Sequence, residues 1–433
     1  MTSMMLQYLE IKEQYKDFIL FYRLGDFYEM FFNDAITASR ELELTLTGRD
    51  CGEPERAPLG GVPYHSVEPY IGKLISKGYK VAICEQMEDP SETKGIVRRE
   101  VVREITPGTV VEASLLNETK NNYLCSLYFD RNKVGIAFAD ISTGEMCATS
   151  VENEPSRILN ELGTYAPKEI ITNIDKENGA FLIDFAKEKL GALVEFGMHN
   201  YYEDKRCTGR VIEQFGIEFL DKYSQDTSVV LATGAILEYI IKTQKTDISY
   251  ISAVNVYGEG QYLEMDLNTR RNLELCESMR SKEKRGSLYW VLDKTKTSMG
   301  ARMLRSYIEH PLLDVKKILE RQGAVSTLAS NIVLRGELIN LLSSVLDLER
   351  LMTKVVYSTA NGKDLKAIAS TLSVIPEVKN LLYTAEAREL VNIREGLDSL
   401  EDVTTLINDA FIDLPPFSIR EGGFIKDGYS QEV

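Results

Sequence analysis

The spacing of apolar residues changes once along this 433-residue chain, and that change limits the folds the chain can adopt. As far as about residue 245, short apolar runs typical of strands alternate with stretches in which apolar residues recur every three or four positions, as they do on an amphipathic helix. From there on, only the helical spacing continues. The chain is therefore expected to begin with mixed α/β structure and to end in an all-helical domain.

Turn-forming segments divide the α/β part in two. The polar segment TPGTVVEASLLNETKNN indicates a connector. Residues 1–116, which end within it, predict a small mixed α/β domain. After it, residues 117–245 predict a second one, in which YLCSLYF, VGIAFADIS and EMCATSV form an antiparallel meander and KEIITNI adds a strand. Residues 246–433 are expected to be helical.

One helix of that last domain can be bounded from its sequence, SMGARMLRSYIEHP. Thr297 or Ser298 can cap its start, and Pro311 ends it. Its apolar residues form one stripe, made by Met299, Met303, Leu304, Tyr307 and Ile308.

Composition excludes several classes of protein. With 66 acidic against 50 basic residues, the surface as a whole does not suit non-specific binding of polyanions, so any nucleic-acid contact must be local. The six cysteines are scattered and only three histidines are present, which predicts buried thiols rather than disulfides or a zinc site. No apolar run approaches the ~20 residues that a membrane span needs. We therefore expect no membrane association and a cytoplasmic location.

The decapeptide RLGDFYEMFF, from Arg23 to Phe32, allows two interpretations. If Asp26 caps a helix, Glu29 occupies its third position, and DFYE is a capping box followed by a helix whose aromatic residues enter the core. If residues 26–29 are extended instead, the period of two places Phe27 and Glu29 on the same side, as an exposed ring beside a carboxylate.

Three further features have a functional and a structural interpretation. The basic run Lys94, Arg98, Arg99 and Arg103 could follow a phosphate backbone or form a solvated strand face. Asp140 could be the first metal ligand of a nuclease, but such chemistry needs several convergent carboxylates. His65 in VPYHS is better explained as a turn or packing residue than as a base.

Longer segments resemble a known family. FYRLGDFYEMFFNDA, GVPYHSVEPYIGKLISKGYKVAICEQMEDP and REVVREITPGT resemble the first domain of the MutS family of bacterial DNA mismatch-repair proteins. FADISTGEM resembles the second domain of that family. MDLNTRRNLEL, VLDKTKTSMGARMLRSYIEHPL and the late segment FIDLPP to REGGFIKDGY resemble its helical core. These segments follow the family order over essentially the whole chain.

The resemblance implies a mismatch-recognition domain over residues 1–116, a ribonuclease-H-like connector domain over residues 117–245, and a helical core that enters a lever over residues 246–433. It implies that Phe27 and Glu29 read the mismatch, that Arg49 contacts the DNA backbone, and that Leu24 lies near the same groove. It also implies partners: double-stranded DNA with mismatches or small loops, a second copy in the homodimer of the complete family protein, and a MutL-type repair protein. The competing hypotheses are a helical interaction scaffold and a metal-dependent nuclease.

The family also hydrolyses ATP, and this function is not expected of the 433 residues. A phosphate-binding loop requires G-x-x-x-x-G-K-[ST]. The two Gly-Lys pairs, Gly72-Lys73 and Gly362-Lys363, are followed by Leu74 and Asp364. The sequence therefore resembles a MutS protein truncated before its clamp and ATPase domains, which would bind the ATP and magnesium, and no cofactor is expected in this chain.

We predict that the purified 433-residue chain does not turn over ATP, because its sequence contains no loop whose backbone amides could hold the phosphates. Phosphate release with magnesium present, measured with and without DNA, checks this. Turnover that follows the chain through successive purification steps would contradict the prediction.

Overall fold

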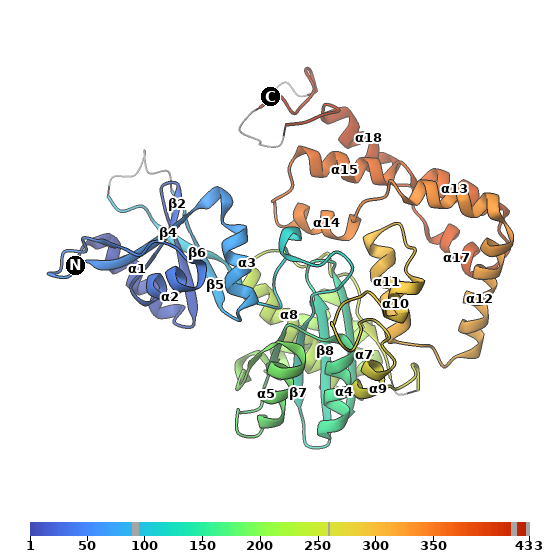
Figure 1. Cartoon of the computed structure of the whole chain (residues 1–433), viewed down its shortest axis with the longest axis horizontal. Helices are drawn as coiled ribbons and strands as arrows, with labels where there is room; N and C mark the ends of the chain where they lie inside the picture. The colour runs from blue at the N-terminus through green and yellow to red at the C-terminus, as the bar shows by residue number, and fades with distance from the viewer. Residues whose placement is uncertain (89–94, 259, 417–421, 430–433) are drawn as a thin grey trace. The chain divides into compact units, whose positions relative to one another are not determined.

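The computed structural model describes residues 1–88, 95–258, 260–416 and 422–429. By its internal contacts the chain divides into two compact units, residues 1–117 with 122–256 and residues 118–121 with 257–433. The first unit holds two sheets, and the second consists mainly of helices (Figure 1). The expected order of mixed α/β structure followed by helices is confirmed.

The first sheet has six strands in the order β3-β4-β2-β1-β5-β6. Neighbouring strands are antiparallel except β1 and β5, which are parallel. The strands are β1 (Phe18–Leu24), β2 (Phe27–Phe31), β3 (Thr47–Arg49), β4 (Ala57–Pro63), β5 (Lys80–Gln86) and β6 (Arg99–Ile105). Three helices accompany them: α1 (Ser3–Gln14), α2 (Phe32–Leu42) and α3 (Glu68–Ser76).

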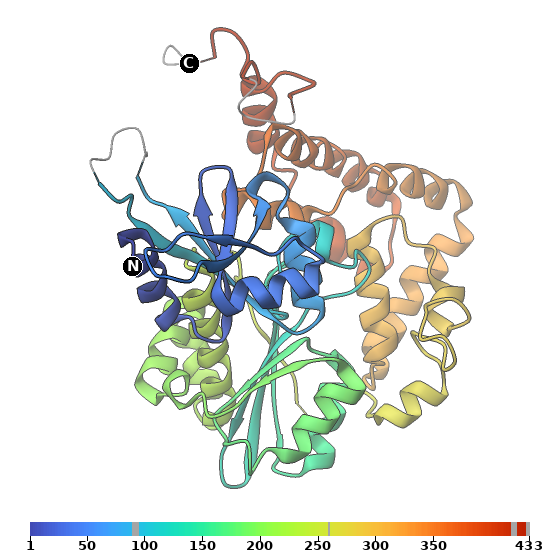
Figure 2. The same ribbon diagram turned by 60° about the vertical axis from the view of Figure 1, so that its left-hand side comes forward.

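Helices cover both faces of this sheet (Figure 2). On one face, α1 packs over a core that includes Tyr8, Tyr22 and Phe31. On the other face, α2 and α3 pack over a core that includes Tyr28 and Met30. Because successive side chains of a strand point to opposite faces, β2 contributes to both cores.

The capping-box interpretation of DFYE is wrong, since residues 27–31 form the strand β2 and helix α2 begins only at Phe32. Leu24 and Phe27 pair across a two-residue turn in which Gly25 has φ +55°. Glycine at the first central position is what a type II′ hairpin turn requires, and aromatic residues favour the strands on either side. The extended alternative is therefore confirmed. Tyr28 and Phe31 lie on opposite faces rather than on one helical arc.

The second sheet has the order β11-β10-β7-β8-β9-β12. The predicted meander is confirmed: β8 is antiparallel to β7 and β9, while β10 runs parallel to β7. The strands are β7 (Leu124–Phe129), β8 (Lys133–Asp140), β9 (Glu145–Glu152), β10 (Glu169–Thr172), β11 (Leu193–Glu195) and β12 (Asn255–Val256). The helices are α4 (Pro155–Tyr165), α5 (Ala180–Phe185), α6 (Asp204–Phe215), α7 (Ile217–Tyr223) and α8 (Thr227–Gln244).

Buried polar contacts join the two sheets within the first unit. Glu169 on β10 is fully buried and accepts hydrogen bonds from the Thr106 hydroxyl, from the Gly108 amide at 2.9 Å and from the Tyr239 hydroxyl at 2.5 Å. Thr106 and Gly108 directly follow β6, whereas Tyr239 lies on α8. Removing any of these partners would leave a buried polar group unsatisfied, so the segment after β6 is held on the second sheet.

The second unit contains short and medium helices over its described residues. They are α9 (Leu267–Asn272), α10 (Leu288–Leu292), α11 (Ser298–Glu309), α12 (Val315–Ser330), α13 (Ile332–Leu342), α14 (Leu348–Val356), α15 (Gly362–Leu372), α16 (Ile375–Leu381), α17 (Arg388–Gly396) and α18 (Glu401–Ala410). Of the expected start of the lever, residues 417–421 and 430–433 lie outside the described residues. No helix in the described ranges is long and apolar enough to cross a membrane.

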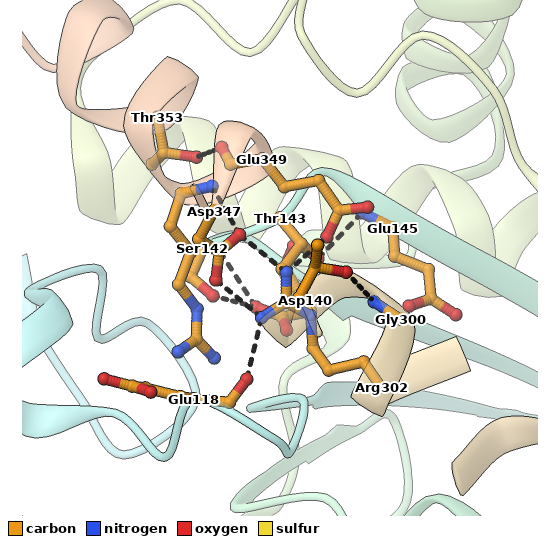
Figure 3. Close-up of polar contacts among 12 residues, drawn as sticks. Glu118, Asp140, Ser142, Thr143, Glu145, Gly300, Arg302, Asp347, Glu349 and Thr353 are labelled. Carbon is orange, nitrogen blue, oxygen red and sulfur yellow. Dashed lines mark hydrogen bonds and ion pairs between the residues drawn. The ribbon is translucent and has the colours of Figure 1, made fainter. Parts of the chain in front are cut away.

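Helix α11 begins as predicted, because the Thr297 hydroxyl accepts a hydrogen bond from the Gly300 amide. Its buried residues differ from the predicted apolar stripe: Ala301 and Arg302 are buried, whereas Met303 is exposed. Arg302 donates to both carboxylate oxygens of Asp347, at 2.7 and 2.8 Å, and to the Glu118 carbonyl at 2.9 Å (Figure 3). The guanidinium thus ties residue 118 to the helices of this unit.

The buried carboxyl of Glu169 leads to a pH prediction. Burial raises the pKa of Glu169 above its usual value, despite the three donors that favour the charged form. The folded chain therefore holds this proton more tightly than the unfolded chain. The stability that Glu169 contributes is fully present below its unfolded pKa, about 4.3, and is lost as the pH rises through the raised folded value.

Glu169→Gln keeps the shape of the side chain and removes the titration. We expect the free energy of unfolding of the original chain, minus that of the variant, to fall as the pH rises from about 4 towards 7. Urea unfolding of both chains at several pH values measures this difference. A difference that stays constant or rises with pH would contradict the argument.

Candidate DNA interface

The turn between β1 and β2 exposes an aromatic ring. Phe27 is the first residue of β2, and 47% of its surface is exposed, although the other aromatic residues of this strand are buried. A Cβ atom at Gly25 would have nothing within 4 Å, so the turn beside the ring is open. A large apolar side chain held at an open rim is available to stack on a partner.

The structure brings all four residues implied by the resemblance to one face of the first sheet. Phe27, Glu29 and Phe31 alternate along β2 and share a face, and Phe31 marks it as the face that α1 covers. Leu24 pairs directly with Phe27. Arg49 on β3 pairs with Ala57, which is buried in the same core as Phe31. Directly opposed residues of antiparallel strands share a face, so Leu24 and Arg49 lie on it as well.

Two of these residues form an ion pair. The Arg49 guanidinium donates from Nη1 to Oε2 of Glu29 at 2.5 Å, which connects β3 to β2 across β4. The side chains are 38% and 20% exposed, respectively. Gly61 is the β4 residue opposite Glu29, and a Cβ atom there would lie 3.6 Å from Glu29 Cγ, so the missing side chain leaves room for the Glu29 side chain to reach across β4. The sequence gives no sign of this pairing, because the partners lie far apart along the chain.

Residues on the opposite face hold the turn in place. The Arg23 guanidinium donates to the Gly25 carbonyl at 2.5 Å and lies 3.4 Å from the centre of the Tyr64 ring. The Tyr64 amide donates to the Asp26 carbonyl at 3.0 Å. These positioning residues were missed at the sequence level. One signal was available: Arg23 is the neighbour of Leu24 on a predicted strand, so its side chain falls on the opposite face.

The basic run does not form a row of free cations where it is described. Arg99 is 7% exposed and donates to the Arg23 carbonyl at 2.9 Å, and Arg103 pairs with Glu112 at 2.7 Å. Arg98 pairs with Glu100 at 3.1 Å. Lys94 lies outside the described residues. The three arginines are therefore engaged within the protein, and a solvated strand face describes only Arg98 among them, because Arg99 is buried and Arg103 is partly buried.

Asp140, the possible nuclease residue, is fully buried at the end of β8. It accepts hydrogen bonds from the amide and hydroxyl of Ser142, at 2.9 and 2.7 Å (Figure 3). It also accepts one from the Asn122 amide at 3.1 Å. Over the described ranges, no three His, Cys, Asp or Glu side chains gather so that they could hold a metal ion. The geometry of Asp140 is that of a residue stabilising a turn.

The remaining candidates behave as structural residues. His65 lies exposed on a short 3₁₀ turn and its ring makes an edge contact with the Tyr64 ring. All six cysteines are buried free thiols, as predicted.

The fold is thus that of a multidomain protein in which two mixed α/β sheets are followed by a helical unit. Family models match the chain in three consecutive ranges: MutS domain I over residues 2–114, MutS domain II over 122–252 and MutS domain III over 268–432. The chain belongs to the MutS family.

Individual relatives agree with this assignment. Over its whole length, the chain is 49% identical to the DNA mismatch repair protein MutS of Lachnoclostridium phytofermentans, 46% to that of Acetivibrio thermocellus and 49% to that of Ruminiclostridium cellulolyticum. It covers 47%, 50% and 50% of those proteins, respectively. The chain therefore spans about half the length of the curated relatives it matches.

The contrast between two neighbouring aromatic residues can be tested by mutation. Because Phe27 is half exposed, Phe27→Ala should lower the free energy of unfolding by no more than about 1 kcal/mol. Tyr28 is 6% exposed in the core under α2 and α3, so Tyr28→Ala should lower it by about 3–5 kcal/mol. Urea unfolding monitored by circular dichroism measures both. Equal losses would show that the Phe27 ring is packed in solution.

Proposed function

We propose that this chain recognises mismatched DNA through the α1-side face of its first sheet, with Phe27 entering the minor groove at a mispaired or unpaired base. The observation that carries the proposal is the exposed Phe27 ring at an open turn, on the same face as Glu29, Arg49 and Leu24. The relatives named DNA mismatch repair protein MutS support it.

The physical basis of selectivity would be deformation of the duplex. A phenyl ring that stacks on a base contributes ~1–3 kcal/mol whichever base it meets. Entering the groove also unstacks a base step and kinks the duplex. A mismatched site has already lost part of its pairing and stacking, so its deformation costs less than that of a matched site. The ring thereby reads how easily the DNA deforms rather than its sequence.

Glu29 would supply a second level of selectivity by hydrogen-bonding the base. An ionised carboxylate only accepts hydrogen bonds and is repelled by nearby phosphates, so it penalises a duplex that offers no partner. A base displaced from its pair exposes an N–H group. In this proposal Arg49 contacts the DNA backbone, and Leu24 packs near the same groove beside Phe27.

The domain assignment forms part of the proposal. We assign residues 1–116 to mismatch recognition, 117–245 to the connector domain and 246–433 to the helical core with the first part of its lever. The order β9-β8-β7-β10-β11, with the first three strands antiparallel and the last two parallel to β7, supports a ribonuclease-H-like topology for the connector.

ATP binding and dimerisation are proposed for the domains of whole MutS proteins that this chain does not span. ATP and magnesium would bind in the ATPase domain, and that domain and the clamp would complete a homodimer that works with a MutL-type partner in the cytoplasm, at the nucleoid. The two alternatives have less support. An interaction scaffold with no DNA role leaves the exposure of Phe27 unexplained, and nuclease chemistry lacks a described carboxylate cluster around Asp140.

Phe27→Ala should weaken binding to a duplex with one mismatch by roughly 5- to 150-fold, the factor that corresponds to ~1–3 kcal/mol of stacking. Binding to the matched duplex should change less, because deforming a matched site costs more free energy and offsets most of what the ring gains by stacking. Fluorescence anisotropy at about 50 mM salt measures both affinities, since binding through a few phosphate contacts is weak and each contact loses affinity as salt rises.

The controls separate folding from recognition. Glu29→Gln removes the repulsion from phosphates and should tighten matched binding more than mismatched binding, which narrows their ratio. Glu41→Gln changes the same charge on α2, on the other face of the sheet, and should leave the ratio unchanged. An unchanged ratio in Phe27→Ala, in a chain that remains folded, would overturn the proposed function.

A further inference from the structure

The Glu29–Arg49 ion pair places two roles of the proposed function in conflict. Glu29 is to accept a hydrogen bond from a base, yet its Oε2 atom already accepts one from Arg49 Nη1 at 2.5 Å. Arg49 is to contact a phosphate, yet its guanidinium already binds a carboxylate. Neither group can form its full contact with DNA while the ion pair remains intact.

We propose that Arg49 is a positioning residue that controls when Glu29 acts: it holds the carboxylate in the DNA-free chain and releases it when a backbone phosphate takes the carboxylate's place. The inference rests on the proposed function. Carboxylate and phosphate oxygens are both recognised by the donors of a guanidinium, so the exchange replaces one anionic acceptor by another. The base-reading carboxylate would thus become free only where a duplex already lies on the face.

The burial of the pair fits such an exchange. Both side chains are partly exposed, at 20% and 38%, so solvent weakens their attraction. Breaking an ion pair of this kind lowers binding by a factor of about five or less. A charge-assisted hydrogen bond from the guanidinium to a phosphate can offset that loss. A fully buried pair would instead be costly to break from one side.

The strand geometry keeps the released carboxylate near the ring. Glu29 and Phe27 lie two positions apart on β2 and project from the same face. The backbone between them is fixed by Tyr28, which is buried on the other face and donates through its hydroxyl to Glu85. Release of Arg49 therefore requires side-chain rotation and no change of the sheet.

A double-mutant cycle distinguishes this exchange from two independent contacts. If Arg49 only binds phosphate, Arg49→Gln weakens binding to a matched duplex by the same factor whether residue 29 is Glu or Gln. If Arg49 must first leave Glu29, the factor is larger in the Glu29→Gln background, where the contact is made without breaking the pair. We expect it to be about two to five times larger.

Three further measurements test the exchange. Arg40→Gln changes the same charge on α2, in a residue that pairs with Glu41, and should cost the same in both backgrounds. Arg49→Lys retains the charge and should restore part of the coupling. In urea unfolding without DNA, the double variant should lose less stability than the sum of the two single variants.

The outcomes separate this inference from the function on which it rests. Additive effects in the unfolding cycle, or equal Arg49→Gln factors in both backgrounds, would overturn the exchange even if Phe27→Ala still abolished mismatch preference. If only the exchange is overturned, the proposed recognition of the mismatch by Phe27 still stands. A chain that binds no duplex, or whose mismatch preference survives Phe27→Ala, would overturn both.

Discussion

The alternation of side chains along β2 is the constraint on which the candidate interface depends. Tyr28 and Met30 enter the core under α2 and α3, while Phe31 enters the core under α1. Phe27 and Glu29 share the face of Phe31 but lie nearer the turn, and there Phe27 is exposed. A shift of the strand by one residue would move Phe27 and Glu29 to the face of α2 and α3 and would move Tyr28 and Met30 to the face of α1.

Burial of the neighbouring residues stabilises this arrangement. Leaving about half of a phenyl ring in water forgoes roughly 1 kcal/mol, whereas full burial of Met30 and of Phe31 contributes about 1.5–3 kcal/mol each. The register that exposes Phe27 is therefore favoured by the residues that follow it. The Arg23 contact to the Gly25 carbonyl and the Tyr64 contact to Asp26 then fix the turn itself. The exposed Phe27 ring is tolerated because the following strand residues are buried and the turn beside it is held by hydrogen bonds.

Most of the secondary structure could be predicted because it depends on local patterns. Strands β7, β8 and β9 follow from short apolar runs separated by turns, and α11 from its cap at Thr297. The sequence was ambiguous at residues 26–29, where the pattern of a capping box competed with the turn chemistry of Gly25. The hairpin is favoured because β2 is hydrogen-bonded in the sheet on both sides, to β1 and to β4. That pairing is a tertiary contact that no local pattern contains.

The site could be predicted only in part, for the same reason. The face of Phe27 follows once residues 26–29 are extended, since the period of two then sets it, and its exposure comes from its place beside the turn. The contact of Glu29 with Arg49 depends on the order β3-β4-β2 and on Gly61, none of which is visible in the spacing of residues. Arg302 gives a second example: a charged residue outside the predicted apolar stripe of α11 suggests nothing of its burial or of its bonds to Asp347 and to the Glu118 carbonyl.

The magnitudes at the interface assign different roles to its groups in the proposed function. Base stacking of ~1–3 kcal/mol exceeds the ≤1 kcal/mol or so of a partly exposed ion pair. The ring therefore dominates affinity for a deformable site, and the ion pair is too weak to oppose it. The pair can instead set the order of two steps, because Arg49 must bind a phosphate before Glu29 is free to bind the base. A weak and solvent-screened contact suits that role, since a stronger one would keep Glu29 from the base even after DNA had bound.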